Sequence, residues 1–357
     1  MKLKYLAITF LAVSNTSIAN ASGRLLFTQF ESESFSEIAP IEQIIHDLEG
    51  DPVNPGHFAF THNQIEVGQQ QGNIELSYFL RYDYFVEFSR DTAELAYLLR
   101  NDLPLPDNKT YDVDLRANHI FAQGIAAAYR FEFQETLSGK IKLNYLNVSK
   151  TKDGSLRGLL SSQEDSYNAN LHLDYGYTED TLLDRPKSAK TGHGVSLDLD
   201  LFWQASDKLT LGLQARDMLS WIRFSKLTYT TADADTNNVS FDEDGRISTK
   251  PAVVGVEGFR NQTQKLPHRY SASAKYFINQ SDYLRAETFS YNRNVFPRLA
   301  YGRQFSEITT QLEYDFRSKA LGLAFTGKYL SLKLRSDDLD WEKATHLELA
   351  ISFKIQL

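Results

Sequence analysis

The sequence predicts an all-β chain that forms a single transmembrane, antiparallel, up-and-down β-barrel of about 14 strands, within a range of about 12 to 16. Three observations lead to this fold class. Many segments alternate apolar and polar residues, the chain ends inside such a segment, and it begins with the features of an export signal. Because a strand turns successive side chains to opposite faces, such segments can face lipid on one side and water on the other.

The final segment, residues 346–357, shows the pattern most clearly. Its polar residues His346, Glu348, Ser352 and Lys354 fall on one face. Its other face is apolar throughout and is formed by Leu347, Leu349, Ile351, Phe353, Ile355 and Leu357. We expect one membrane strand here, with no soluble tail after it.

Residues 1–21 have the pattern of a cleavable secretory signal. Lys2 and Lys4 precede an apolar stretch at residues 6–13, and small residues at Ala19 and Ala21 frame a cleavage site. The apolar stretch is too short to span a bilayer as a helix, and no later segment offers the roughly 20 apolar residues that a helix needs. If this chain enters a membrane, it does so as strands.

The composition excludes several classes of function. The formal net charge is −8, which disfavours nucleic acid as a partner because phosphates are bound by basic surfaces. The chain has no cysteine, which excludes disulfides and thiol chemistry. We expect no cofactor and no metal site.

Residues 22–55 are expected to form an N-terminal segment that precedes the barrel of residues 56–357. Within it, residues 36–50 change to a helical period and predict a short amphipathic helix. This helix would fold into the lumen as a plug or rest at the periplasmic rim; a surface helix packed on any β domain is the alternative. The residues that carry this prediction are Ile41, Ile44, Ile45 and Leu48, with Ser36, Pro40 and Gly50 at the ends.

The length of the alternating segments favours a membrane barrel over a soluble sandwich. About 11 residues tilted by about 40° span the roughly 25 Å apolar band of an outer membrane, whereas soluble strands average about five or six residues. Predicted strands cover residues 57–68, 73–88, 110–122, 125–135, 139–149, 165–178, 193–204, 207–217, 221–231, 247–258, 267–279, 282–292, 296–304, 307–316, 319–326, 328–336 and 346–357. Turns are expected at 71–73, 138–139, 153–154, 206–207, 279–282 and 337–340, loops at 150–165, 179–192, 232–246 and 259–266, and a short helix at 91–100.

Charged residues of both signs recur on the face that would line the lumen. They either border a water-filled passage or pair across strands and close the barrel as a polar plug. Both interpretations stay open at this point. The candidate lumen residues are Glu75, Arg81, Asp83, Glu87, Asp112, Asp114, Arg116, Arg130, Glu132, Lys333, Arg335 and Glu348.

An enzymatic function is not expected. His172 and Asp174 share one face of a predicted strand, and Ser196 and Asp198 share a face of another, which raises the alternative of a barrel hydrolase. A catalytic triad needs its three groups within hydrogen-bond reach, and same-face His/Asp pairs arise by chance among alternating strands. We therefore predict no catalytic residues.

The export signal, the alternating segments and the C-terminal run resemble the outer-membrane β-barrels of Gram-negative bacteria. In that class the C-terminal strand carries a signal read by the barrel-assembly machinery, which here would be Leu349, Ile351, Phe353, Ile355 and Leu357; the class commonly ends in phenylalanine, and this chain ends in leucine. The helix before the barrel also resembles the hatch of hydrophobic-compound channels similar to long-chain fatty-acid transporters. The resemblance implies an outer-membrane location, with membrane lipid and the assembly machinery as partners.

The function expected from these features is a passive channel or uptake pore for small solutes. The alternative is a non-conducting outer-membrane barrel that serves as an accessory or scaffold in envelope assembly. The sequence leaves the solute, the oligomeric state and the orientation of the loops open.

Overall fold

The computed structural model describes residues 23–163, 166–179, 190–236, 239–241, 247–249 and 252–357. The predicted secretory signal at residues 1–21 lies outside these residues. No helix among the described residues has the length and apolar character needed to cross a membrane.

Within the described residues, fourteen antiparallel strands form a closed barrel, as the sequence predicts. Closure comes from β1 and β18, which pair from Leu25 opposite Gln356 to Phe35 opposite His346. The wall strands are β1 (Arg24–Ser36), β2 (Phe58–Gln71), β3 (Ile74–Phe88), β4 (Thr110–Gln134), β5 (Leu137–Gln163), β7 (Gly192–Ser206), β8 (Leu209–Asp235), β12 (Arg269–Phe277), β13 (Asp282–Tyr291), β14 (Asn294–Phe305), β15 (Ile308–Asp315), β16 (Leu321–Thr326), β17 (Leu330–Ser336) and β18 (His346–Gln356).

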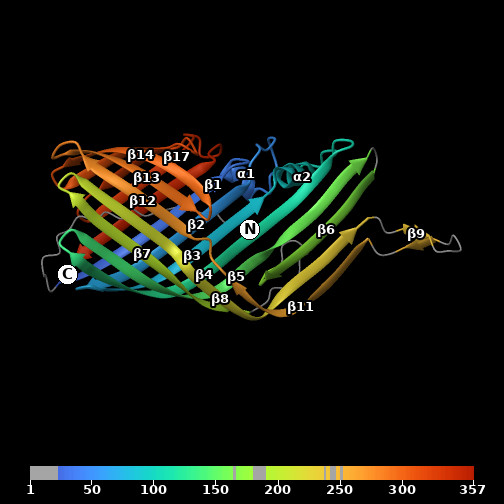
Figure 1. Cartoon of the computed structure of the whole chain (residues 1–357), viewed down its shortest axis with the longest axis horizontal. Coiled ribbons are helices and arrows are strands. Elements are labelled where there is room, and N and C mark those ends of the chain that lie inside the picture. Colours follow the sequence, from blue (N-terminus) through green and yellow to red (C-terminus); the bar gives the residue numbers. More distant parts are fainter. Residues whose placement is uncertain (1–22, 164–165, 180–189, 237–238, 242–246, 250–251) are drawn as a thin grey trace.

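Three wall strands, β4, β5 and β8, continue well past the others and carry a protruding sheet at one end of the barrel (Figure 1). There β6 (Ser166–Tyr177) takes the place of β7 between β5 and β8, and β11 (Val253–Gln264) pairs with the outer half of β8. A small hairpin of β9 (Val239–Phe241) and β10 (Ile247–Thr249) lies beyond it.

The two ends of the barrel differ in their connections. At one end, here called the turn end, β1 begins, β18 ends, and short turns at residues 72–73, 135–136, 207–208, 278–281, 306–307 and 327–329 join the strands. At the opposite loop end lie residues 37–57 with α1 (Ile41–Ile45), residues 89–109 with α2 (Arg90–Arg100), and the protruding sheet. Short periplasmic turns and longer extracellular loops are typical of outer-membrane barrels.

The outer surface of the barrel is apolar over successive strands. Four leucines from β15 to β18 stand opposite one another in register, namely Leu312, Leu323, Leu334 and Leu349. Leu323 is 63% exposed although it lies in the middle of a strand. On β18 the inward residues His346, Glu348 and Ser352 are buried while Phe353 and Ile355 are exposed, which confirms the predicted alternation.

α2 begins at Arg90, one residue before the helix predicted at 91–100, and Ser89 is its N-cap. The Ser89 hydroxyl accepts a hydrogen bond from the Thr92 N–H at 3.0 Å. Ser89→Ala is expected to destabilise this helix locally by about 1 kcal/mol, since one orphan N–H loses its partner. Faster amide exchange across residues 90–100, restored by Ser89→Asn, would bear this out; unchanged exchange would show that tertiary contacts alone hold the helix.

α2 packs against the outer face of the protruding sheet. Its Leu95 joins a cluster with Tyr111 of β4 and neighbouring leucines of β5 and β6. The Lys109 ammonium, which leads into β4, donates to Glu94 at 2.6 Å, and this hydrogen bond raises the pKa of Lys109. The loop and the start of β4 are thereby tied to the helix.

The placement of residues 22–55 before the barrel is wrong. Residues Arg24–Ser36 form β1, which pairs with both β18 and β2 and is part of the wall. The predicted helix at 36–50 is reduced to the five residues of α1, which lie after β1 at the loop end instead of in the lumen. The helical spacing of Ile41, Ile44 and Ile45 can be recognised in the sequence. β1 was not predicted as a strand because several of its outward residues are polar.

Two predicted loops and two predicted turns are also wrong. Residues 150–163 belong to β5, so the expected turn at 153–154 lies within a strand, and residues 259–264 belong to β11. The expected turn at 138–139 lies three residues later than the observed connection at 135–136. The pairs of segments predicted at 110–122 and 125–135, and at 207–217 and 221–231, are each one long strand, β4 and β8. The prediction assumed that every strand is just long enough to span the membrane. β4, β5 and β8 are longer because they continue into the protruding sheet.

Candidate functional site

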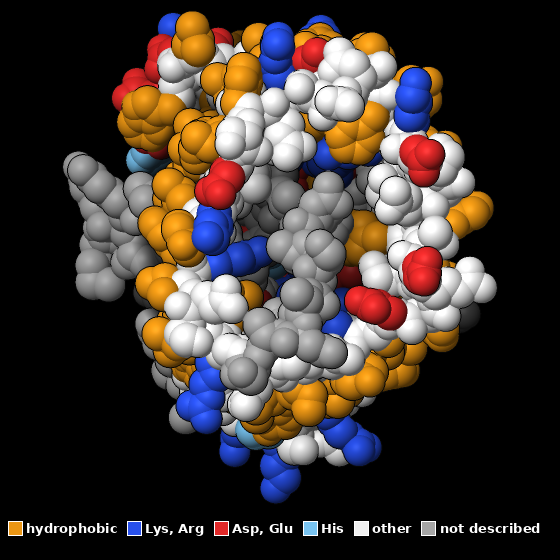
Figure 2. Space-filling model, turned by 90° about the vertical axis from the view of Figure 1, so that its left-hand side faces the viewer, with side chains coloured by type: hydrophobic (Ala, Val, Ile, Leu, Met, Phe, Trp, Pro, Cys, Tyr) orange, Lys and Arg blue, Asp and Glu red, His pale blue; other side chains and the backbone are white. Residues whose placement is uncertain are grey.

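The candidate site is the interior of the barrel. Inward positions of the wall carry charged residues of both signs, many of them buried. Figure 2 views the barrel from the turn end, where hydrophobic side chains cover much of the outer ring and Lys and Arg side chains are visible inside it. The distribution is that of a barrel with an apolar exterior and a polar lumen.

One ion pair crosses the lumen between strands that are not neighbours. Arg81 of β3 donates two parallel hydrogen bonds to Asp217 of β8, at 2.9 and 2.6 Å. Three strands separate β3 from β8 in the wall, so this contact spans the interior. Arg81 Nε also donates to Asp83 at 2.6 Å, and Arg269 of β12 lies 3.5 Å from Asp217. Bidentate arginine–carboxylate pairs are among the strongest charged contacts in proteins.

His62 extends this network toward β1. Its Nδ1 lies 2.5 Å from Asp83 Oδ1, and its Nε2 lies 3.3 Å from Glu31 Oε2. The ring is buried between the two carboxylates and links the inward faces of β1, β2 and β3. Together with Arg81 and Asp217, it forms a continuous polar layer across the barrel, here called the septum.

A second buried ion cluster adds to the septum on the side of β14 to β18 and β1. Arg298 of β14 donates to Glu33 of β1 at 2.8 Å and to Asp315 of β15 at 2.8 Å. Lys333 lies 2.6 Å from Glu348, and Arg335 contacts both Glu313 and Glu348. The Arg298–Glu33 pair again joins strands that are not neighbours.

Within the described residues, Glu33, His346 and Glu348 form the group whose ligand atoms lie close enough to suggest a metal ion. The cations of Arg298, Arg335 and Lys333 are already bound to these carboxylates. A divalent ion would have to share the space with three positive charges, which Coulomb repulsion disfavours. These residues are therefore part of an ion-pair network and do not fit a metal centre.

Aromatic side chains fill the interior at the loop side of the septum. Phe60 of β2 stacks on Tyr291 of β13 with 4.1 Å between ring centroids, and Phe35 of β1 meets Phe296 of β14 at 5.0 Å. In each pair the two rings come from strands that are not neighbours in the wall and meet inside the barrel, where they are buried. A second buried cluster surrounds Leu266, where the chain passes from β11 to β12.

Toward the turn end, ion pairs continue; Lys142 and Glu66 are buried, whereas Arg130 and Arg216 are partly exposed. Lys142 of β5 contacts Glu66 of β2 at 2.6 Å, which is another cross-lumen pair. Glu75 accepts from the half-buried Arg130 at 3.1 Å, and Asp200 accepts from Arg216 at 2.6 Å.

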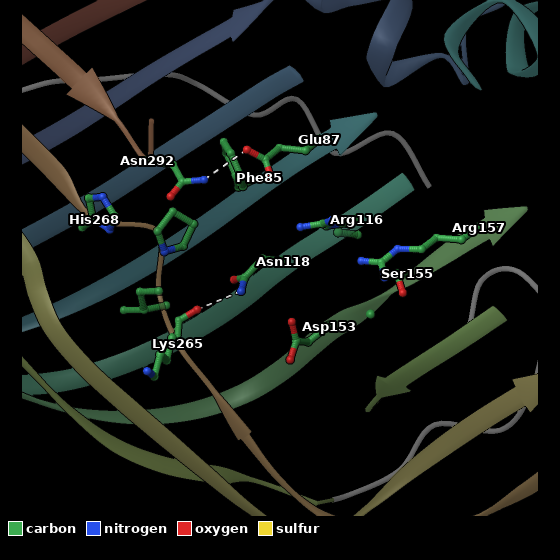
Figure 3. A pocket seen from close by; sticks show the side chains of 14 residues that line it. Phe85, Glu87, Arg116, Asn118, Asp153, Ser155, Arg157, Lys265, His268 and Asn292 are labelled. Carbon is green, nitrogen blue, oxygen red and sulfur yellow. Dashed lines mark hydrogen bonds between the residues drawn. The ribbon is translucent and has the colours of Figure 1, made fainter. Parts of the chain in front are cut away.

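At the loop end the interior opens into a cavity of about 460 Å³ (Figure 3). Its wall comes from β3, β4 and β5, from the segment between β11 and β12, and from the turn between β13 and β14. A second hollow beside it shares Glu87 and Arg116. The charged and polar residues that line the larger cavity include Glu87, Arg116, Asn118, Asp153, Ser155, Arg157, Lys265, His268 and Asn292.

The structure divides the candidate lumen residues among three environments. Arg81, Asp83, Lys333, Arg335 and Glu348 are buried in ion pairs of the septum. Glu75 and Arg130 pair with each other on the turn side, and Glu132 is exposed near the turn end. Glu87, Asp112, Asp114 and Arg116 line the loop-end hollows.

The partners of these residues were missed by the sequence reasoning. Asp217, Glu33, Arg298 and Lys142 hold the cross-lumen contacts, yet each lies far along the chain from its partner. Lys142 could have been found from the sequence, because it is a charged residue at an inward position of the strand predicted at 139–149. Asp217 lies at an irregularity in the pairing of β7 and β8 with a positive φ of 53°, which breaks the alternation that would have revealed it.

The residues of the hydrolase alternative do not form a triad. His172 Nδ1 lies 2.7 Å from Asp233, Asp174 binds Arg260, and Ser196 accepts from Asn144 on the inward face of the barrel. His172 and Ser196 contact different partners on different strands, so these two residues do not form a nucleophile–base pair.

Comparison with known proteins leaves the family open. No family model matches the chain, and no curated protein matches it. Among solved structures, it is similar to the toluene transporter TodX of P. putida (TM-score 0.43, 9% identity, covering 95% of this chain and 89% of that one). It is also similar to a FadL homologue of Pseudomonas aeruginosa (0.36, 10%, 94% and 87%) and to a mutant of the Rh. blastica porin (0.26, 8%, 93% and 99%).

Proposed function

We propose that this chain is an outer-membrane channel that lets small polar solutes pass by diffusion and that is closed in the present conformation. The observation that supports the proposal is the arrangement of charge in the interior. A cavity lined by charges opens at the loop end and charged side chains line the turn end. Between them lie the septum of ion pairs and the aromatic layer on its loop side.

The outward surface supports the membrane location. Rows of exposed leucine around mid-strand positions would be costly in water, because about 25 cal/mol is lost for each Å² of apolar surface left in water. In a bilayer the same surface is in its preferred solvent. The loop end would then face the outside of the cell, as long loops do in this class of barrel.

The septum is suited to act as a gate because ion pairs can exchange partners. Arg81 has Asp83 as a second acceptor, and Asp217 has Arg269 as a second cation. Separation of the Arg81–Asp217 pair would therefore leave each charge with a remaining partner. Once the ion pairs separate, water readily solvates the charged side chains on the inner wall. An interior of purely apolar side chains would not be hydrated in this way.

Recordings in planar lipid bilayers test this function. Purified protein, shown to be folded by its different gel mobility before and after boiling, should give traces that are closed most of the time with brief, discrete openings. Substitutions in the septum should lengthen the openings. If folded wild-type and septum variants never conduct, the channel is excluded, and the non-conducting scaffold becomes the better account of the paired interior.

A further inference from the structure

The loop-end cavity has a charge pattern that the closed channel does not by itself require. Its volume of about 460 Å³ lies within the range of sites that hold small molecules. Figure 3 shows Arg116 and Arg157 reaching into it from the inward faces of β4 and β5, with Glu87 on one side and Asp153 on the other. Charges of both signs thus border one space.

The two arginines form a positive pole. Nε of Arg157 lies 3.2 Å and Nε of Arg116 lies 3.7 Å from the same oxygen, Oδ1 of Asp114. One carboxylate therefore holds two guanidinium groups close together and compensates one of their two charges. Both side chains are about half exposed, at 56% for Arg116 and 51% for Arg157, so a solute can reach them. A guanidinium has five N–H donors in a planar fork, and the N–H groups not directed at Asp114 suit a second carboxylate.

Two acids form the negative pole, and their side-chain hydrogen bonds come from neutral amides, while the ammonium of Lys265 lines the same cavity. Asn292 donates to Glu87 at 3.1 Å, and Gln262 donates to Asp153 at 2.7 Å. An amide donor orients a carboxylate without compensating its charge. An ammonium group near these oxygens would be stabilised, whereas a second anionic group on the solute would be repelled.

We propose that this cavity binds small zwitterionic solutes of the amino-acid type, with the carboxylate at Arg116 and Arg157 and the ammonium toward Glu87 or Asp153. The inference rests on the proposed channel function and names the class of solute that enters it. A neutral hydrocarbon would gain nothing from these charges, and a dianion or a diamine would meet one pole of the wrong sign.

Calorimetric titration of the full chain in detergent micelles tests the site directly, without any need for conduction. The probes are L-glutamine as zwitterion, succinate as dianion, cadaverine as dication and 1-propanol as neutral solute. We expect L-glutamine to bind with a Kd on the order of 1 mM, since two solvent-accessible charge contacts support only weak affinity. Binding of the other three should be about tenfold weaker or undetectable.

Two variants separate the poles. Arg116→Gln combined with Arg157→Gln should weaken L-glutamine binding about tenfold, because charged hydrogen bonds to its carboxylate are lost. Glu87→Gln combined with Asp153→Asn should abolish the preference for L-glutamine over succinate. The matched control is Arg223→Gln, which changes an exposed, outward arginine of β8 and should leave binding unchanged.

The outcomes distinguish the site from the channel. Equal binding of all four probes, or unchanged binding in the double arginine variant, overturns the zwitterion site even if the protein conducts. Selective binding by a protein that never conducts supports the site and removes the channel function instead.

Discussion

Asp217→Asn is expected to have the largest effect on the barrel, both on its stability and on its conductance. The substitution leaves Arg81 and Arg269 facing each other without their shared carboxylate, in a place where Asp217 is wholly buried. Removing one partner of a buried ion pair typically costs about 3–5 kcal/mol. We expect urea-induced unfolding at markedly lower denaturant concentration, together with longer channel openings, because the two cations repel each other and separate.

A double variant separates the two effects. Arg81→Gln combined with Asp217→Asn removes both charges, so it should recover most of the lost stability while the openings stay longer than in the wild type. Lys343→Gln in the loop is the control, since its pair with Asp340 is exposed and lies outside the barrel wall. A double variant that is as stable as the wild type and equally closed would show that the aromatic layer alone blocks the lumen.

Leu323→Arg is expected to have the second largest effect. Leu323 of β16 is 63% exposed and belongs to the row of outward leucines that runs from β15 to β18. In a water-soluble protein an exposed leucine usually tolerates arginine within about 0.5 kcal/mol. On the lipid face of a membrane barrel the same change costs up to about 2–4 kcal/mol near the midplane. Reversible unfolding from lipid vesicles measures the difference.

The chain contains a matched control for this substitution. Leu339, in the connection between β17 and β18, is fully exposed but lies beyond the ends of both strands. Leu339→Arg should leave the stability in vesicles unchanged. If both substitutions are equally harmless, the outer surface of β16 does not contact hydrocarbon.

The sequence predicts the barrel well because one face of each strand is under a single physical constraint. Outward positions must be apolar, so residues 73–88 and 346–357 alternate over their full length and appear as β3 and β18. Counting such segments gives 17 rather than 14, because β4 and β8 were each divided in two and the segments of β6 and β11 belong to the protruding sheet, while β1 was missed. β8 was divided near Asp217, where its pairing with β7 is irregular. β4 was divided at Gln123 and Gly124, although its pairing with β3 runs through both residues without a break.

The parts that sequence did not predict depend on contacts between distant residues. β1 was missed because its outward face carries Thr28, Ser32 and Ser34, so that its alternation is weak, and its identity as a wall strand comes from pairing with β18 at the other end of the chain. The charged lumen residues were found by alternation alone. Which of them are paired across the lumen and which face a cavity depends on barrel closure, which brings Glu33 to Arg298 and Arg81 to Asp217.

The most direct test of the central claim, that the outward side chains of this barrel contact lipid, is the accessibility of nitroxide labels in reconstituted vesicles. Labels at Leu323 and Leu349 should collide often with molecular oxygen, which concentrates in hydrocarbon, and rarely with a water-soluble nickel chelate, while a label at Leu339 should show the reverse. Ready access of the nickel chelate to Leu323 and Leu349 would contradict the membrane barrel and, with it, the channel.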